Sequence, residues 1–157
     1  IAKLLLNVKV NYAICLFKAG QAEPTVKLLE AYLPELQEIP EAPIEGINMC
    51  RQILQTVYTG TGRHPEALAS MTADWEYNCT RFGEVSEPAI TIINNRANYY
   101  FALQDWPKAK ADHQEVLRYL CLLQGADHHE TTGSVTATVA MFKQAGQSFE
   151  PFPNGKP

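Results

Sequence analysis

Apolar residues recur at steps of three and four along almost the whole chain, which is the spacing of amphipathic helices. Leu5, Val8, Tyr12 and Leu16 show it in the first such segment. Glycines and prolines punctuate the pattern, and no segment has the two-residue alternation of a half-buried strand. The pattern therefore predicts an all-α chain of about seven helices, near residues 2–19, 22–38, 44–60, 64–81, 86–103, 105–123 and 127–145.

Residues with known roles at helix ends refine these boundaries. Ser86 and Asp105 are predicted to cap the fifth and sixth helices with their side chains, and Asp127 or Thr131 to cap the seventh. Pro34 lies late in the second helix, where we expect it to kink the helix or end it early.

One spacing organises the whole pattern. Gly20, Gly62, Gln104 and Gly146 stand 42 residues apart (62−20, 104−62 and 146−104), each at the end of an amphipathic segment. A fixed period of about 20 to 50 residues is typical of repeat proteins, in which each unit must stack on its neighbours to bury its apolar face. The spacing predicts a repeat architecture and favours binding over catalysis.

Small and large apolar residues recur around these turns. They are Ala13 and Leu16 before Gly20, Tyr58 before and Ala67 after Gly62, Ala97 and Tyr100 before and Trp106 and Ala109 after Gln104, and Val139 and Phe142 before Gly146. This pattern resembles the tetratricopeptide repeat (TPR), and the period is that of the longer, kinesin-light-chain-like subtype, against about 34 residues for the common form. The resemblance implies a right-handed superhelix of antiparallel helix pairs, a TPR-like α-solenoid of about three and a half repeats.

The resemblance covers residues 1–147, which we expect to form one helical repeat domain. Residues 148–157 hold three prolines and a glycine, so they are predicted to be an irregular tail. The chain begins at Ile1, inside an apolar segment, and we expect it to be a piece of a longer polypeptide.

Charge and cysteine usage narrow the choice of partners. The net charge is −4 and the basic residues are scattered, which argues against a nucleic-acid surface. Polar residues interrupt every apolar stretch before it reaches the length of a membrane span, about 20 residues. The four cysteines lie far apart within helical segments, so we expect buried free thiols in a reducing, cytoplasmic setting.

The resemblance also implies a site, because the first helix of each repeat lines the concave face on which this family usually binds peptides. The 42-residue register places a neutral, amide-rich set of side chains there. The set is Asn11, Ile14, Phe17, Lys18, Gln52, Thr56, Asn94, Asn95, Asn98, Phe101 and Lys143. Its amides can pair with a peptide backbone of any sequence, and Phe17 and Phe101 are the expected apolar anchors. The alternatives are an ordinary solvated helix surface or a surface for self-association.

Other candidate chemistry is weaker. The run from Asp127 to Glu130 contains two histidines, but adjacent loop residues rarely share one ion, so we predict a polar linker and no metal site. His113 stands where the family has a large apolar residue, and we expect a packed, hydrogen-bonded histidine. Trp106 and Tyr100 are assigned to the core. No catalytic or phosphate-binding motif is present, so we predict neither an enzyme nor a cofactor.

The sequence thus predicts a protein- or peptide-binding scaffold. One alternative is a peptide-sensing, regulatory segment of a larger signalling or transcription-regulating protein. Another is a structural module for homo-oligomerisation, because the fourth repeat lacks a second helix and would leave Val135, Val139 and Phe142 partly uncovered.

Overall fold

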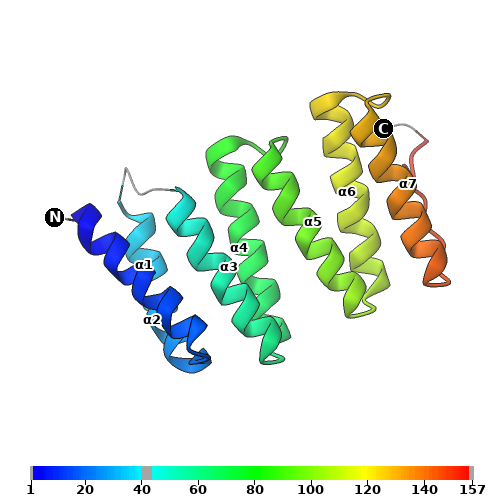
Figure 1. The fold of residues 1–157 in the computed structure, drawn as a ribbon. Helices are drawn as coiled ribbons and strands as arrows, with labels where there is room; N and C mark the ends of the chain where they lie inside the picture. The colour runs from blue at the N-terminus through cyan, green and yellow to red at the C-terminus, as the bar shows by residue number, and fades with distance from the viewer. Residues whose placement is uncertain (1, 40–43, 156–157) are drawn as a thin grey trace. The chain divides into compact units, whose positions relative to one another are not determined.

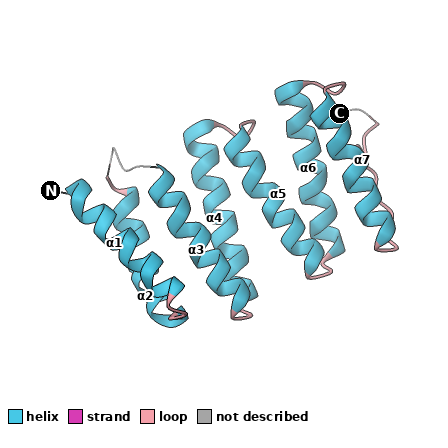
Figure 2. Cartoon of the chain, in the orientation of Figure 1, coloured by secondary structure: helices cyan, strands magenta, loops and turns pink. Residues whose placement is uncertain are grey.

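The computed structural model describes residues 2–39 and 44–155, and over these ranges the chain forms seven α-helices and no strand (Figure 1; Figure 2). They are α1 (Ala2–Lys18), α2 (Ala22–Gln37), α3 (Ile44–Gly60), α4 (His64–Phe82), α5 (Glu87–Ala102), α6 (Trp106–Gln124) and α7 (His129–Gln144). Every helix that the sequence predicts is present, and the predicted ends agree within two residues. The prediction of an all-α chain is confirmed. No helix in the described ranges combines the length and the apolar character needed to cross a membrane.

The chain divides into two compact units, Ile1–Asp74 and Trp75–Pro157. In the first unit, α1, α2 and α3 pack against one another. Their contact surfaces are fully buried at Ala13 of α1, Leu29 and Leu36 of α2, and Ile47 and Cys50 of α3. These residues follow the three- and four-residue steps of the sequence, so the core of this unit is the apolar stripe of each helix.

The second unit is centred on the α5/α6 hairpin, whose two helices run antiparallel (Figure 1). Ile90 and Ile93 of α5 form a buried cluster with Val116 and Tyr119 of α6, and Trp75 packs against this cluster. Helix α7 packs on α6. The buried apolar cluster of this unit therefore lies between α5 and α6, with Trp75 of α4 packed against it.

The 42-residue period is present in the backbone itself. At Gly20, Gly62, Gln104 and Gly146 the φ angles are +72°, +73°, +59° and +71°. At all four turns the amide of this residue donates to the carbonyl three residues earlier, and the next amide donates to the carbonyl five residues earlier. This paired bonding is the Schellman motif, which ends a helix through a residue in the left-handed region. The four turns are equivalent, as the spacing predicts.

Gln104 is the one non-glycine residue with positive φ in the described ranges, which leads to a paired prediction. Gln104→Gly should raise the free energy of unfolding by about 0.5–1 kcal/mol. Glycine adopts the left-handed conformation without strain, which stabilises the folded chain. The greater flexibility of glycine in the unfolded chain opposes this stabilisation only in part. The reverse change, Gly62→Gln, should lower it by about 1 kcal/mol. A Cβ atom at Gly62 meets nothing within 4 Å, so the backbone alone sets the effect. Urea unfolding of both variants checks the prediction; a loss on Gln104→Gly would contradict it.

The position five residues after each of the first three turn residues is buried, as the resemblance implies. Thr25, Ala67 and Ala109 are all fully inaccessible to solvent. Thr25 departs from the small alanine of the other units, and its hydroxyl donates to the Gln21 carbonyl at 2.6 Å. The hydroxyl is therefore satisfied within its own helix, and the first unit keeps the register of the others.

Several helix ends differ from the prediction. Helix α2 continues through Pro34 to Gln37, because the fully buried Leu36 holds the last turn in place. Ser86 occupies the cap position of α5, but its hydroxyl donates to the Gly83 carbonyl at 2.7 Å and makes no cap bond. The Asp105 cap is confirmed, since its carboxylate accepts from the Lys108 amide.

The capping residue of α7 also differs from the prediction. His128 is its N-cap, with Nδ1 accepting from the Glu130 amide at 3.4 Å. Neither Asp127 nor Thr131 takes this role, because the helix begins at His129 and Thr131 lies buried inside it. Sequence preference for a cap is a local property, whereas the burial of Thr131 depends on its packing in the fold.

Residues 148–155 form no helix or strand and lie against α6 and α7. The Phe149 ring stacks on the Phe142 ring at a centroid distance of 4.7 Å, and Gln114 donates to the Glu150 carbonyl at 2.8 Å. Phe142 is fully buried as a result. The expectation that it would be uncovered is wrong, because the tail covers it in place of a further helix. Val135 and Val139 remain partly exposed.

Candidate functional site

The predicted groove residues fall into two sets, one in each unit. In the first unit, Asn11, Lys18, Gln52 and Thr56 are exposed, and Ile14 and Phe17 are half-buried. In the second unit, Asn95, Asn98 and Lys143 are exposed, and Asn94 and Phe101 are half-buried.

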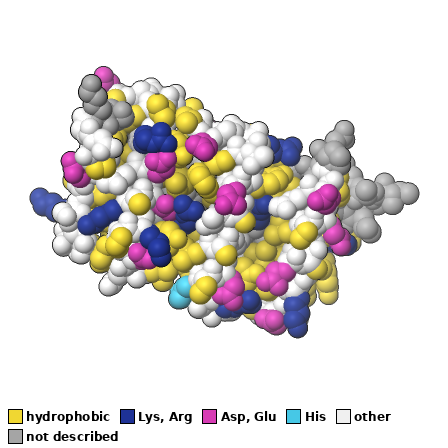
Figure 3. All heavy atoms as spheres, turned by 180° about the vertical axis from the view of Figure 1, so that it is seen from behind, with side chains coloured by type: hydrophobic (Ala, Val, Ile, Leu, Met, Phe, Trp, Pro, Cys, Tyr) yellow, Lys and Arg dark blue, Asp and Glu magenta, His cyan; other side chains and the backbone are white. Residues whose placement is uncertain are grey.

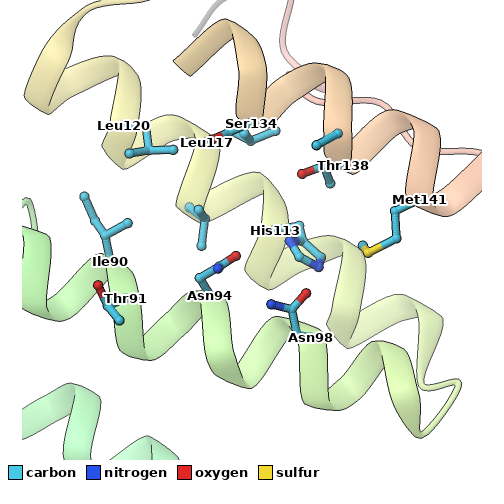
Figure 4. Close-up of a pocket in the computed structure, with 12 residues that line it drawn as sticks. Ile90, Thr91, Asn94, Asn98, His113, Leu117, Leu120, Ser134, Thr138 and Met141 are labelled. Atoms are coloured by element: carbon cyan, nitrogen blue, oxygen red, sulfur yellow. The ribbon is translucent and has the colours of Figure 1, made fainter. Parts of the chain in front are cut away.

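The structure brings two of these residues together at a cavity of about 410 Å³ in the second unit (Figure 4). Asn94 and Asn98 lie on its α5 wall, with Ile90 and Thr91. The α6 floor consists of His113, Val116, Leu117 and Leu120, and the α7 wall of Ser134, Ala137, Thr138 and Met141. On each wall the residues follow helical spacing, so they share one face of their helix. Asn95 and Lys143 do not line this cavity.

Phe101 has a role in packing. Its ring lies edge-on to the Trp106 ring at 5.2 Å and to the Phe142 ring at 5.1 Å. Such edge-to-face pairs stabilise by about 0.5–1.5 kcal/mol beyond the buried area. Phe101 thus connects α5, α6 and α7 beside the cavity, and does not stand free as an apolar anchor.

The polar groups of the cavity carry no fixed charge. The side chains of Asn94 and Asn98 make no hydrogen bond to another residue in the described ranges, so their amide groups are available to a ligand. An ion pair between the same two helices joins Arg96 of α5 to Asp112 of α6, with nitrogen–oxygen distances of 2.7 and 2.9 Å, and neither residue lines the cavity. On the face that Figure 3 draws, basic and acidic side chains are interspersed. None of the residues that line the cavity is an Asp, Glu, Lys or Arg, so the cavity suits an uncharged group.

His113 is the unusual member of the set. The residue is 3% exposed, and its Nε2 atom has no hydrogen-bond partner among the described residues. Burial lowers the pKa of the imidazole below its usual value of 6.5, and the neighbouring Asp112 carboxylate opposes this shift only in part. The ring packs edge-on against Phe142 at 5.6 Å. The prediction of a packed histidine is confirmed, but its Nε2 is not hydrogen-bonded as expected.

The pKa of His113 predicts an acid-sensitive stability. Above pH 6.5 the ring is neutral in both folded and unfolded chains, so the full stability is present. As the pH falls below 6.5, the imidazole becomes protonated in the unfolded chain but stays neutral in the folded chain, because its pKa there is lower. The free energy of unfolding therefore falls with pH, by at most about 1.4 kcal/mol for each unit by which the pKa is lowered. Urea unfolding at pH 7.5 and 5 should show this loss. In His113→Met the loss should be smaller; an equal loss in both proteins would contradict the assignment.

The other candidate groups offer no second site. The His128 and His129 rings lie 4.4 Å apart, and within the described residues no three His, Cys, Asp or Glu side chains are grouped to hold a metal ion. All four cysteines are free thiols. Burial raises the pKa of Cys50 to about 11, which makes it a poor nucleophile. Cys15 is exposed, so the expectation that every thiol is buried is wrong.

Comparison with known proteins defines the class of fold. No family model matches the chain, and no curated protein matches its sequence. The crystal structure of BtubC (BKLC) from P. vanneervenii is similar, with a TM-score of 0.61 and 19% sequence identity. The match covers 85% of this chain and 52% of that chain, so this chain spans about half the length of that structural neighbour. The chain has a TPR-like helical repeat fold.

The cavity could not be read from the sequence as a unit. The register identified Asn94 and Asn98, but it also selected Asn95 and Lys143, which lie outside the lining. It missed His113 as a site residue because a histidine in a helical core position is usually structural. One feature of the sequence did mark His113 as unusual. The positions 42 and 84 residues before it hold Met71 and Leu29, which are both apolar and buried.

Proposed function

We propose that this chain is a protein-binding scaffold module that holds an extended peptide segment of its partner along the cavity of the second unit. The observation that carries the proposal is the pair of unbonded amides, Asn94 and Asn98, above an apolar floor. An amide side chain can donate to and accept from a peptide backbone at once. The TPR-like fold supports the same function, because such folds are generally protein-binding.

The finer assignments belong to the same proposal. The four equivalent turns support the 42-residue, kinesin-light-chain-like subtype. The chain acts by binding, without a cofactor and without catalysis. Its four free thiols fit a reducing compartment such as the cytoplasm.

Self-association through the last repeat is the weaker alternative. The largest apolar side chain that would drive it, Phe142, is buried, because Phe149 stacks on it, and only Val135 and Val139 stay partly exposed. No feature of the described residues favours a peptide-sensing regulatory role over simple peptide binding.

The proposal is tested with peptides selected from a random display library on the intact chain. Synthetic copies of the retained peptides are titrated by calorimetry against the wild type and single variants. Asn98→Ala and Asn94→Ala should each weaken binding by about three- to tenfold, the range expected for one lost hydrogen bond.

Asn95→Ala is the matched control. Asn95 is exposed on the same helix but does not line the cavity, so this variant should bind as the wild type does. Unchanged affinity in Asn94→Ala and Asn98→Ala would overturn the proposal. A loss confined to Asn95→Ala would move the site to another face of α5.

A further inference from the structure

The α7 wall of the cavity departs from the packing pattern of the repeats. On α3, which packs against α1 and α2, one face is apolar and at most 8% exposed, and its residues are Cys50, Ile53, Leu54 and Val57. The residues two periods later (134−50 = 84) all line the cavity, and they are Ser134, Ala137, Thr138 and Met141. Three of these four side chains are smaller or more polar than their counterparts on α3. The cavity is therefore bounded by a helix face that is filled with apolar side chains in the first unit.

The two hydroxyl groups of this wall are open to a ligand. Ser134 and Thr138 are half-buried, and neither hydroxyl oxygen is fully enclosed by the described residues. Neither side chain makes a hydrogen bond to another described residue. Thr136 differs, because it is exposed on the same helix and its hydroxyl donates to the Thr132 carbonyl at 2.9 Å. The unbonded hydroxyls of α7 therefore lie on the face that lines the cavity.

The polar groups of the two walls have the same spacing. On α5, Asn94 and Asn98 are four residues apart. On α7, the same interval separates Ser134 from Thr138, and Figure 4 shows the two pairs pointing from opposite helices into one space. Four residues advance along a helix by about 6 Å. The backbone groups on one edge of an extended strand recur every two residues, or about 6.6 Å. Each wall therefore matches one edge of a strand.

The floor of the cavity fits the same shape. It is formed by α6 and includes the apolar side chains of Val116, Leu117 and Leu120. A strand directs its backbone N–H and C=O groups sideways and its side chains alternately up and down. Polar walls beside an apolar floor are therefore complementary to a strand that lies lengthwise in the cavity. A bound helix would satisfy its own backbone groups and leave the polar groups of both walls unused.

We infer that Ser134 and Thr138 form a second edge of the peptide site, so that the partner segment lies between α5 and α7 as an extended strand with hydrogen bonds along both edges. The inference rests on the proposed function, which assigns the α5 edge alone. It also specifies the partner, because every second side chain of the segment faces the α6 floor. No lining residue is an Asp, Glu, Lys or Arg, so these side chains are uncharged and apolar. The side chains between them face solvent and are free to vary.

The test measures, by calorimetry, the affinity of display-selected peptides for the intact chain and its variants. Thr138→Val and Ser134→Ala each remove one hydroxyl and should weaken binding about three- to tenfold. Both should keep the wild-type thermal midpoint, because neither hydroxyl is bonded within the described fold. Thr136→Val is the matched control outside the lining and should bind as the wild type does. An equal loss in Thr136→Val and Thr138→Val would overturn the inference.

Chemical variants of the same peptides show whether both edges are used. N-methylation removes a single backbone N–H, and successive N–H groups of a strand point to opposite edges. Methylation should therefore weaken binding at each of several successive residues, whereas a strand held by α5 alone would respond only at every second one. Alanine substitution along the peptide should show a two-residue period. A period of three to four residues would indicate a bound helix and overturn the inference.

A second variant blocks the cavity without removing the α5 edge. Ala137→Ile/Thr138→Leu places two residues of the buried α3 face, Ile53 and Leu54, at their equivalent positions on α7. The thermal midpoint should stay or rise, while peptide affinity falls more than tenfold. Wild-type affinity in this folded variant would contradict the inference. If the double variant fails to fold, Thr138→Val and Ser134→Ala still decide the result.

The outcome is separable from that of the proposed function. If Asn94→Ala and Asn98→Ala weaken binding but Ser134→Ala and Thr138→Val do not, the second edge fails and the scaffold function stands. If none of the four variants changes the affinity, the proposed function fails as well. A loss confined to the α7 variants would contradict both, because the strand would then be held by α7 alone.

Discussion

Asp74→Ala is expected to lower the free energy of unfolding by about 3–5 kcal/mol, because it leaves the guanidinium of Arg51 buried without its main partner. The two side chains form an ion pair between α3 and α4, with Nη1 of Arg51 2.6 Å from Oδ1 of Asp74. Their side chains are 5% and 10% exposed, so water replaces little of the lost interaction. Nε2 of Gln55 lies 3.5 Å from Oδ2 of Asp74. Because the amide of Gln55 is neutral, it cannot replace the negative charge that Asp74 presents to Arg51.

The repeat register supplies an unusually direct control. The positions 42 residues after Arg51 and Asp74 are Ile93 and Val116, which belong to one buried apolar cluster. The double variant Arg51→Ile/Asp74→Val therefore places the apolar pair of the next repeat into this one. It should recover most of the lost stability, because a well-packed apolar pair is often equal to a buried ion pair or better.

Denaturant unfolding followed by circular dichroism measures both proteins. Glu35→Ala serves as the surface comparison, since Glu35 is 62% exposed and pairs with Lys9 at 2.8 Å. It should cost less than about 1 kcal/mol. A loss below about 1 kcal/mol for Asp74→Ala as well would mean that the ion pair is open to water in solution.

Phe142→Ala is expected to lower the free energy of unfolding of the second unit by about 3–5 kcal/mol. Phe142 is fully buried, and the rings of Phe101, His113 and Phe149 all pack against it. Its removal creates a cavity at the junction of α5, α6, α7 and the tail. The second unit can collapse into that space only by losing the edge-to-face contacts that fix these elements.

Phe149→Ala is the matched variant for the tail. It removes one stacked ring but leaves Phe142 in place, so it should cost less, about 1–2 kcal/mol, and expose the face of Phe142. Thermal unfolding ranks the two variants, and sedimentation at several concentrations shows whether the exposed ring causes association. Equal losses for both would indicate that the tail, and not the helix packing, holds the second unit together.

Local chemistry explains what the sequence could predict. The turns at Gly20, Gly62, Gln104 and Gly146 are set by backbone preferences within a few residues, so the spacing alone located them. The helix ends were predicted within two residues for the same reason. The register then extended this local information from one repeat to the next.

The features that the sequence could not predict depend on contacts between helices. The Arg51–Asp74 ion pair forms only because α3 and α4 meet at these residues. The equivalent positions of the other repeats hold different kinds of contact. Lys9 lies over the Tyr32 ring in the first repeat, and Ile93 and Val116 belong to an apolar cluster in the third. The covering of Phe142 depends on the path of an irregular tail, which has no periodicity to read.

The candidate site was predictable to the same extent. Asn94 and Asn98 follow from the register, because side chains four residues apart share a helix face. The Nε2 atom of His113 could not be identified as unbonded, since its environment comes from three helices at once.

Methyl NMR of the three methionines during a peptide titration tests the central claim most directly. Met141 lines the cavity, whereas Met71 is a buried core residue in α4 of the first unit. If a selected peptide binds along the cavity, the Met141 methyl signal shifts saturably, in step with the calorimetric affinity, and the Met71 signal stays in place. Saturable binding that leaves the Met141 signal unmoved would contradict the account.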